Sequence, residues 1–583
     1  QEGTSVLTFC PSRTSAEKKF YAAIKMNPSL SGKMAVYRAG LRADERERIE
    51  AGLKNGSIRG VFSTSALELG VDIGMLEVCI LVGFPPTMMS MWQRSGRVGR
   101  GGKDGAIVVV ASDGLVDNYF LHHQDEFFAR ENERLVATLT NETILVGHFA
   151  CAKKEVNGEY QNLHANIFGP EFAGIMERYK EQQLEHGILY SDSPHSEVNI
   201  RNIDDFQYSI VCGNEELGDI SGQQILREAY EGAVYYHAGQ RYRVKHIIQG
   251  ERRVRVEPEP SSNETRPNVR VSIERGKPHH VQEWDSFRIG YGPMKVRQSI
   301  ASYFEYTDHG RQLGQFPTRP RTREFPTLGF WLELHPQTVS ALSAGSNHAM
   351  LAAGLHGVEH VLSGLLPVIV PCDPNDYDAQ SSAKAGEPAV IYVYDNVHGG
   401  IGLSQAGYTA FADLVNRAYE LIHDCACEGE SGCPNCVQSS RCFNFTDLVG
   451  KGEAIRLLQA LKNWISANPP QVKDFKTNTA GHLALAAAAD IVVPADADKE
   501  AFVGFSPGSF VKHEKFGIGK VLGNSTGPSS AKILVDFGGK KLNVAGARFL
   551  KLITGEEIIV CRQCGTDDNA PGANLCKNCG SEL

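Results

Sequence analysis

Long apolar runs and an apolar leader are both missing from this sequence. No stretch reaches the ~18 apolar residues that a membrane-spanning helix requires. The longest candidates, residues 483–489 and 491–494, are rich in alanine or interrupted by Asp and Pro. The first residues, QEG, have neither a basic start nor an apolar core, so we expect no signal peptide. These absences favour a cytoplasmic protein with no membrane partner.

An excess of basic charge is missing as well. The 583 residues carry 59 Lys and Arg against 68 Asp and Glu, a net charge of −9. A protein that binds a polyanion can have this balance when its basic residues are gathered locally, so the overall charge neither supports nor excludes nucleic acid. The length predicts about four domains at roughly 150 residues each, and 42% hydrophobic residues is ordinary globular composition.

A third absence is a phosphate-binding loop of the pattern G-x-x-x-x-G-K-[ST]. The Gly-Lys pairs of the sequence are all followed by a residue other than Ser or Thr. No acidic motif stands where it could hold Mg²⁺ beside such a loop. The chain by itself is therefore not expected to hydrolyse ATP.

Residues 1–112 alternate short apolar runs with amphipathic stretches. This alternation predicts a parallel, doubly wound sheet. The expected strands are 5–10, 34–37, 60–63, 78–82 and 106–111, and the expected helices are 15–26 and 42–55.

The rest of the chain changes composition several times, which predicts an α/β multidomain protein. The expected order is a helical connector with a winged-helix-like stretch at 113–200, a β-rich module at 201–300, an α+β domain at 301–465, a linker at 466–503, a small SH3-like or Tudor-like barrel at 504–553, and a cysteine-rich tail at 557–583. Within the β-rich module, residues 240–255 carry six Lys and Arg against one Glu.

The motif with the clearest chemistry is QRSGRVGR at residues 93–100. Two arginines three apart, beside glycines, can approach the terminal phosphates of a nucleotide. Arginine suits this role because its planar guanidinium matches phosphate oxygens and stays charged. The alternative for this segment taken alone is a basic loop on the surface.

Three further motifs precede it: FCPSR at 9–13, YRAGL at 37–41 and STSALELGVDIG at 63–74. In this order the four resemble motifs IV, IVa, V and VI of superfamily 2 helicases. The resemblance covers residues 1–112 as the second RecA-like lobe. It implies that the first lobe, with its phosphate-binding loop, is missing, so that the chain is either a fragment or works with another chain that supplies that lobe.

The resemblance also implies roles for single residues. Gln93, Arg97 and Arg100 would face ATP, with the two arginines as arginine fingers. Asp72 would contact the ribose or couple ATP to DNA. Gly70 and Gly96 would lie beside the nucleotide. The residues that would touch the nucleic-acid backbone are Ser12, Arg13, Ser63 and Thr64.

Eight of the fourteen cysteines fall in two tight clusters, a spacing typical of metal sites in a chain without a secretory signal. The first cluster consists of Cys425, Cys427, Cys433 and Cys436. Four thiolates within 12 residues suit a closed, tetrahedral structural zinc site, and Gly432 and Pro434 provide the turn. Reduced cysteines in a loop are the alternative, and Cys442 could replace one ligand.

The second cluster has the spacing of a zinc ribbon, with a glycine after each pair. Its cysteines are Cys561, Cys564, Cys576 and Cys579. We therefore expect two structural Zn²⁺ ions per chain. Unmetallated cysteines in a loose tail are the alternative, and the role of the ribbon is open.

The first cluster ends a longer pattern. HGVEH at 356–360 and GLLP at 364–367 precede IYVYDNVHGGIG at 391–402. This order, with GAVYYH at 232–237, is similar to the MrfA-type bacterial DNA repair helicases and their fungal relatives, over roughly residues 1–465. The resemblance implies a 3′-to-5′ DNA translocase in repair, with single-stranded or 3′-tailed DNA as partner and with ATP and Mg²⁺ as cofactors of the complete enzyme.

Four side chains, His356, His360, Asp373 and Asp395, could be read as a second, catalytic metal site. The histidines are four residues apart and would share a helix face. The string H-G-V-E-H is not the zincin pattern H-E-x-x-H, however. The interpretation we favour is a buried, hydrogen-bonded histidine pair that packs the domain.

The segment VKHEKFGIGKV at 511–521 resembles the Tudor-like barrel of UvrD/PcrA-type helicases. The resemblance implies RNA polymerase or nucleic acid as its partner, and residues 501–553 carry a net charge of +6. A solvated basic barrel is the alternative.

Two functions therefore compete. In the first, the chain is the C-terminal part of an ATP-dependent DNA helicase. In the second, it is a non-catalytic DNA-binding or scaffolding subunit that keeps a RecA-like lobe. The glutamine and arginines of residues 93–100 favour the first, because a scaffold has no need of arginine fingers.

Overall fold

The computed structural model describes residues 4–69, 76–99, 104–133, 207–343, 348–383, 387–439, 449–467 and 470–474, with Cys442, short stretches between 136 and 198, and five strands between 510 and 552. The chain divides into two compact units, Gln1–His482 and Leu483–Leu583.

The larger unit begins with a parallel sheet whose strand order is β2-β3-β1-β4-β5. Its strands are β1 Val6–Phe9, β2 Met34–Tyr37, β3 Gly60–Ser63, β4 Val78–Val82 and β5 Ala106–Val110. The central strand β1, VLTF, is buried at three of its four positions because helices cover both sides of such a sheet. Phe9 pairs with Ser63 of β3 and Leu81 of β4, so these strands end at one edge. The doubly wound, RecA-like sheet is confirmed.

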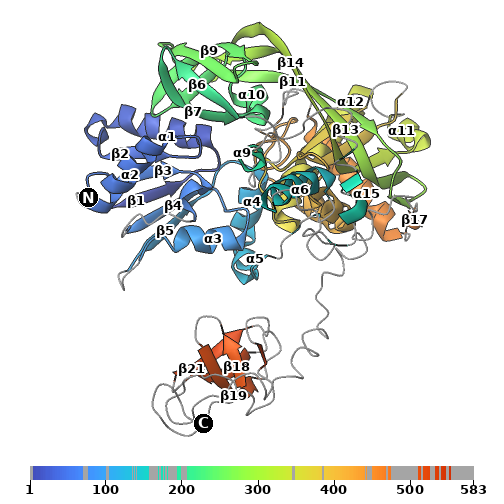
Figure 1. Cartoon of the computed structure of the whole chain (residues 1–583). Coiled ribbons are helices and arrows are strands. Elements are labelled where there is room, and N and C mark those ends of the chain that lie inside the picture. Colours follow the sequence, from blue (N-terminus) through green and yellow to red (C-terminus); the bar gives the residue numbers. More distant parts are fainter. Residues whose placement is uncertain are drawn as a thin grey trace. The chain divides into compact units, whose positions relative to one another are not determined.

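Helices flank this sheet (Figure 1): α1 Arg13–Met26, α2 Ala43–Asn55 and α3 Met88–Ser95, with the short η1 Pro28–Leu30 and η2 Ser65–Leu67. Helix α1 begins at Ser12, whose side chain accepts a hydrogen bond from the Ser15 amide at 3.1 Å. This N-cap satisfies one of the amides that the first turn leaves without a helical partner. Phe20 of α1 then packs against Val36 of β2.

The second sheet is small and mostly antiparallel, with the order β7-β6-β10-β9-β8. We call it the β module. It consists of β6 Gln207–Cys212, β7 Glu215–Ser221, α10 Gly222–Glu228, β8 Val234–His237, β9 Gln240–Ile248 and β10 Arg253–Pro258. Its core also takes in Ile300 and Tyr303, which belong to the next sheet. The two sheets therefore share a hydrophobic core.

The third sheet contains a long hairpin that runs from the β module to the helices of the following domain (Figure 1). Its strands are β11 Glu264–Arg275, β12 His280–Glu283, β13 Phe287–Tyr306, β14 Gln312–Leu334, β15 Tyr377–Ser382, β16 Val390–Asp395 and β17 Gln471–Asp474. The β-rich stretch 201–300 is thus divided between two sheets. Strand β17 pairs with β12 although it falls in the segment expected to be a linker.

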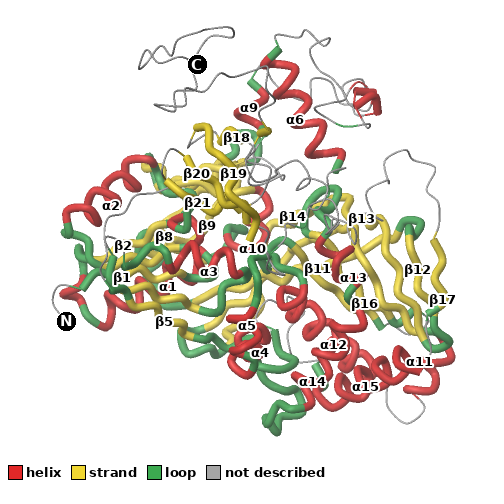
Figure 2. The backbone as a smooth tube through the Cα atoms, turned by 90° about the horizontal axis from the view of Figure 1, so that it is seen from below, coloured by secondary structure: helices red, strands yellow, loops and turns green. Residues whose placement is uncertain are grey.

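Helices pack together beside this sheet (Figure 2): α11 Pro336–Ser343, α12 His348–Ile369, α13 Leu403–Thr409, α14 Phe411–His423 and α15 Lys451–Ala467. Helix α12 is long and apolar enough to cross a membrane by composition, but 67% of its most apolar window is buried. Helix α12 contacts both α14 and α15, so its burial is that of a core helix.

The connector between the first sheet and the β module contains the helices α4 Leu115–His122, α5 Gln124–Ala129, α6 Glu142–Glu155 and α9 Pro194–Glu197. The winged-helix-like stretch expected near 170–190 lies largely outside the described residues.

The smaller unit contains an antiparallel sheet with the order β21-β20-β19-β18-β22. Its strands are β18 Phe510–His513, β19 Gly517–Ser525, β20 Lys532–Phe537, β21 Lys540–Ala545 and β22 Lys551–Leu552. These strands fall within the expected barrel. The cysteines of the expected ribbon lie outside the described residues.

Candidate functional site

The arginine motif occupies the end of α3 and the loop after it. Arg97 is 7% exposed, and its Nε and Nη2 donate to the main-chain oxygen of Glu68 at 3.1 and 2.5 Å. Gln93 is half-buried on α3, and Gly96 forms the C-cap of this helix. The loop is therefore tied to the segment that follows β3, as expected if the two motifs act together.

Glu68 and Arg94 form a contact that the sequence did not reveal. The Glu68 carboxylate accepts from Arg94 Nε at 2.9 Å and from Ser90 Oγ at 3.0 Å, and the Arg94 guanidinium lies 5.3 Å from the centre of the Phe9 ring. Glu68 is the one acid between residues 61 and 71. The signal in the sequence was a single acid in an otherwise uncharged segment, because such an acid requires a partner when the segment is packed. The main-chain oxygen of Glu68 thus binds Arg97, and its carboxylate binds Arg94.

The remaining residues predicted to bind nucleotide are Arg100, Asp72 and Gly70. All three lie outside the described residues. Their roles stay predictions.

The residues predicted to touch a nucleic-acid backbone have different surroundings. Ser12 is exposed and caps α1, and Thr64 is half-buried at the start of η2. These two follow neighbouring strands, so they lie at the same edge of the sheet. Ser63 is fully buried and donates to the Tyr37 carbonyl at 2.8 Å. Its hydroxyl thus holds β3 to β2.

Arg13 faces the β module. Burial lowers the pKa of Arg13, and the nearby carboxylates of Glu228 and Asp219 oppose that effect. The main chains also meet at this junction, where the Asp219 amide donates to the Gly40 carbonyl at 3.1 Å. Gly40 has a φ of +84°, and a Cβ there would lie 2.5 Å from the Asp219 oxygen. Glycine is therefore required for this approach.

A buried ion pair fixes the same junction. Arg38 Nε lies 2.8 Å from Glu17 Oε1, and both side chains are 1% exposed. Arg38 Nη2 also reaches the Tyr235 hydroxyl at 3.1 Å and His237 Nδ1 at 2.9 Å. The Gly239 amide donates to the other Glu17 oxygen at 3.1 Å. Two motifs that are about 200 positions apart in the sequence, YRAGL and GAVYYH, thus meet in one polar cluster.

The four cysteines of the first cluster converge beside the helices that pack against the third sheet. The sulfurs of Cys425 and Cys433, of Cys427 and Cys436, and of Cys433 and Cys436 are each 3.6 Å apart. A tetrahedron with Zn–S bonds of ~2.3 Å has sulfur–sulfur edges of ~3.8 Å. The donor set and its spacing therefore fit zinc, and the first cysteine cluster is confirmed.

The surroundings of this cluster explain its shape. Gly432 has a φ of +66°, and a Cβ would lie 2.3 Å from Val437 and 2.9 Å from the Cys436 sulfur. Lys451 Nζ donates to the carbonyls of Cys425 and Cys427 at 2.7 and 2.8 Å. Burial acts to raise the pKa of the Cys427 thiol, but the Lys451 ammonium and the neighbouring thiols bring it down to about 7. These contacts favour the thiolate that a metal requires.

The cysteine loop also holds the connector. Asn435 lies between two of the ligands, and its main-chain oxygen accepts from Asn118 Nδ2 at 2.9 Å. Its side chain accepts from the Gly114 amide at 3.3 Å. Helix α4, which follows the last strand of the lobe, is thus bonded to the zinc site.

The alternative four-residue catalytic metal site does not assemble. The Asp395 carboxylate is fully buried and accepts from the amides of Ile401, Gly402 and Ser404. Asp373 accepts from the Asn375 amide at 2.8 Å. Both carboxylates therefore hold turns of the main chain.

The histidines of that alternative site lie together on α12, as the interpretation of a buried pair predicts. The ring centres of His356 and His360 are 4.3 Å apart. Burial lowers the pKa of His356, and burial with the neighbouring His356 ring lowers that of His360 to about 4. Cys442 lies beside His356, with its sulfur 3.3 Å from His356 Nε2.

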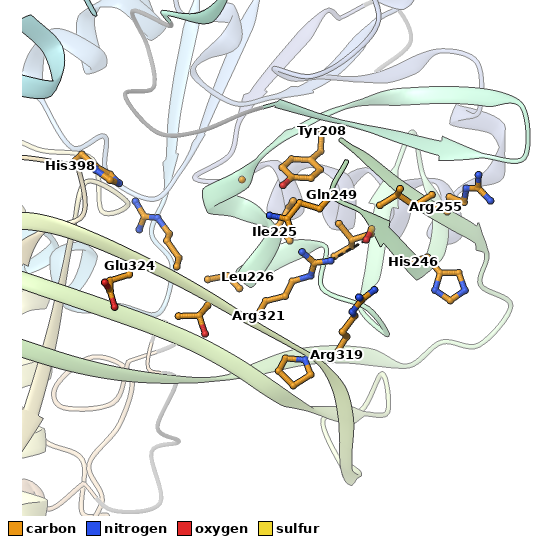
Figure 3. A pocket seen from close by; sticks show the side chains of 16 residues that line it. Tyr208, Ile225, Leu226, His246, Gln249, Arg255, Arg319, Arg321, Glu324 and His398 are labelled. Atoms are coloured by element: carbon orange, nitrogen blue, oxygen red, sulfur yellow. Dashed lines mark hydrogen bonds between the residues drawn. The ribbon is translucent and has the colours of Figure 1, made fainter. Parts of the chain in front are cut away.

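A basic cavity of about 880 Å³ lies between the β module and β14 (Figure 3). Residues 318–320 bulge from β14 opposite Ala301, and this brings Arg321 to the β module, where its Nη2 donates to the Ile247 carbonyl at 3.2 Å. The other basic residues of the lining are His246, Arg255, Arg319, Arg323 and His398. Burial lowers the pKa of Arg321, and lowers that of Arg323 to about 10.

These features define a class of protein. A parallel lobe with an arginine loop tied to the segment after β3, followed by a domain with a four-cysteine site, is a superfamily 2 helicase lobe joined to a zinc-binding domain.

Comparison with known proteins narrows the class. The model of the helicase conserved C-terminal domain matches residues 1–102, and that of the MrfA Zn-binding domain matches residues 358–437. The chain is 30% identical to the uncharacterized ATP-dependent helicase YprA of Bacillus subtilis, over 73% of this chain and 56% of that protein. It is 28% identical to the ATP-dependent helicase hrq1 of Schizosaccharomyces pombe, over 75% of this chain and 42% of that protein.

A solved structure agrees with these matches. The crystal structure of the DUF1998 helicase MrfA bound to DNA superposes with a TM-score of 0.55 at 26% identity, over 79% of this chain and 62% of that chain. In sequence and in fold the chain is therefore similar to the MrfA type of superfamily 2 helicases. It spans about half the length of the curated relatives it matches.

Proposed function

We propose that this chain supplies the arginine side of the ATP site of a DNA translocase. The observation that carries the proposal is the contact of Arg97 with Glu68, which ties the arginine loop to the segment after β3. Phosphoryl transfer depends mainly on positioning and on stabilising charge. A guanidinium whose orientation is fixed by two hydrogen bonds meets the first requirement, and its charge meets the second.

The other side of the site would be supplied by a phosphate-binding loop and a Mg²⁺-binding acid. No G-K-[ST] sequence stands within residues 1–583. ATP hydrolysis by this chain therefore requires a first RecA-like lobe from outside these residues, either fused or in trans.

DNA is the proposed track. A solved relative, MrfA, is described as bound to DNA. In this chain, the basic cavity offers a route for a strand because Arg255 and Arg319 are exposed while Arg321 is half-buried. A phosphate backbone would compensate the charge of these arginines, so binding should be salt-sensitive and largely independent of sequence.

Most of the finer features are carried by resemblance alone. Movement in the 3′-to-5′ direction and action on crosslinked or bulky damage are proposed on that basis. A cytoplasmic location is proposed because the long apolar helix α12 is mostly buried. The partner proposed for the sheet of the smaller unit is RNA polymerase or nucleic acid. Pull-down of RNA polymerase by residues 501–553, compared with a variant in which Lys512 and Lys520 are Glu, tests the last point.

The main proposal is tested in the complete protein that includes the first lobe. Arg97→Lys should reduce DNA-stimulated ATP hydrolysis on the order of 10³-fold, because a point charge cannot replace the planar fork. Arg48→Ala on the exposed face of α2 is the matched control. Hydrolysis that persists at the control rate in a folded Arg97→Lys protein would favour the scaffolding function instead.

A further inference from the structure

A second group of metal-ligating side chains lies beside the four-cysteine site. His356 and His360 are one turn apart on α12, and Cys442 approaches them from the segment after the cysteine loop. One nitrogen of each ring and the sulfur all lie within 4.8 Å of one another. Both histidines are buried, at 7% and 3% exposed, and the cysteine is half-buried.

The hydrogen bond of His360 decides which nitrogen is available. Its Nδ1 lies 2.7 Å from the main-chain oxygen of Val437. A carbonyl oxygen only accepts, so Nδ1 carries the hydrogen and Nε2 carries the lone pair. This is the arrangement of a metal-ligating histidine, whose second nitrogen donates to a carbonyl and thereby fixes the ring.

The other nitrogen of His360 needs a partner. Among the described residues, Nε2 is buried without a hydrogen bond. A buried lone pair without a donor is unfavourable, and a metal ion would remove that cost. The unpartnered nitrogen therefore supports a bound metal independently of the clustering of the three side chains.

We propose that His356, His360 and Cys442 bind a second zinc-type ion in this domain. Two imidazoles and one thiolate are the donors that zinc prefers among divalent ions. A tetrahedral ion with these ligands places sulfur and nitrogen ~3.5 Å apart, and Cys442 Sγ and His356 Nε2 are 3.3 Å apart.

A small cavity borders two of the three proposed ligands. About 60 Å³ of space is bordered by His360 and Cys442 together with Ser363 and Tyr377. A space of this size is large enough for a water molecule. In the proposed site this cavity supplies a water molecule as the fourth ligand, in contrast to the closed four-cysteine cluster.

The two sites are linked through one residue. Val437 directly follows the ligand Cys436, and its carbonyl orients His360. The second ion would fasten the cysteine loop to the core helix α12. The alternative is that no metal binds and that Cys442 and His356 form a thiol–imidazole hydrogen bond.

Metal analysis of the full 583-residue chain separates the two. Cys442→Ser and His360→Gln should each lower the bound zinc by one ion per chain relative to wild type, and the double variant by the same single ion. Cys436→Ser should remove a different ion, so that Cys436→Ser/Cys442→Ser loses two. Cys212→Ser, which removes a half-buried thiol of β6, should change nothing. Unchanged zinc in a folded Cys442→Ser protein overturns the proposal.

A second measurement covers the case in which these variants fail to fold. Native wild-type protein is treated with an alkylating reagent, with and without a chelator, and the modification of Cys442 is followed by mass spectrometry. Bound metal should protect Cys442 until the chelator removes it. Equal modification rates in both samples at Cys442, with protection still seen at Cys427, would show that the cysteine binds no ion.

Discussion

The side-chain amide of Asn118 donates a 2.9 Å hydrogen bond to the main-chain oxygen of Asn435. Asn118 lies on the first helix after the lobe, and Asn435 lies between two zinc-ligating cysteines. The cysteine loop therefore does more than stabilise its own domain. It forms part of the joint between the domain and the lobe that would face ATP.

Loss of zinc from the four-cysteine site should loosen this joint. Structural zinc contributes about 10–16 kcal/mol in small modules, so Cys433→Ser should lower the melting temperature and accelerate amide exchange in both 425–439 and α4. Hydrogen-exchange mass spectrometry reads both segments, with Cys212→Ser as control. If exchange rises in the cysteine loop alone, the coupling to α4 is not real.

Asn118→Ala tests the same joint without touching the metal. Losing one hydrogen bond should cost about 1 kcal/mol, with wild-type zinc content and faster exchange in α4. Gln124→Ala is the matched control, because among the described residues its side chain bonds to the nearby Leu121 carbonyl. Equal denaturation midpoints for the two variants would argue against the contact.

The buried pair of Arg38 and Glu17 should be sensitive to loss of one partner. Glu17→Gln leaves an uncompensated guanidinium in the interior, which typically costs about 3–5 kcal/mol. Replacing both, as Glu17→Leu with Arg38→Met, should cost less than the sum of the two single changes. Urea denaturation of the wild type, Glu17→Leu, Arg38→Met and the double variant measures this, and strict additivity would contradict a direct interaction.

The basic cavity makes a prediction for DNA binding. Arg319→Ala should weaken the affinity for single-stranded DNA and for duplex DNA with a 3′ tail. The slope of log K against log salt should fall by ~0.7 for each phosphate that the variant no longer neutralises. Arg253→Ala, an exposed arginine on β10 that pairs with Glu251, is the control. An unchanged slope in Arg319→Ala would place the strand elsewhere.

The parts of the fold that are local in sequence could be predicted from it. The strands of the lobe were visible as apolar runs separated by amphipathic helices, and the cysteine spacing indicated the zinc site. The turn at Gly432 was also visible, because a glycine between cysteines has few other uses.

Contacts between distant segments could not be predicted in this way. Arg38 lies in a helicase-like motif, but nothing near it shows that Tyr235 and Glu17 complete its surroundings. Strand β17 was hidden because its pairing with β12 joins residues almost 200 positions apart. Asn435 lies between two of the clustered cysteines, and only the structure places it against α4.

The composite ATP site is tested most directly by measuring DNA-stimulated ATP turnover with and without a first RecA-like lobe. We predict no helicase-like turnover for the 583-residue chain alone, and restored turnover when that lobe is added by fusion or in trans. In the restored protein, Arg100→Ala should reduce turnover on the order of 10³-fold or more, with little change in DNA affinity. Robust hydrolysis by the isolated chain, or full activity in an Arg97→Ala/Arg100→Ala double variant, would contradict a composite site.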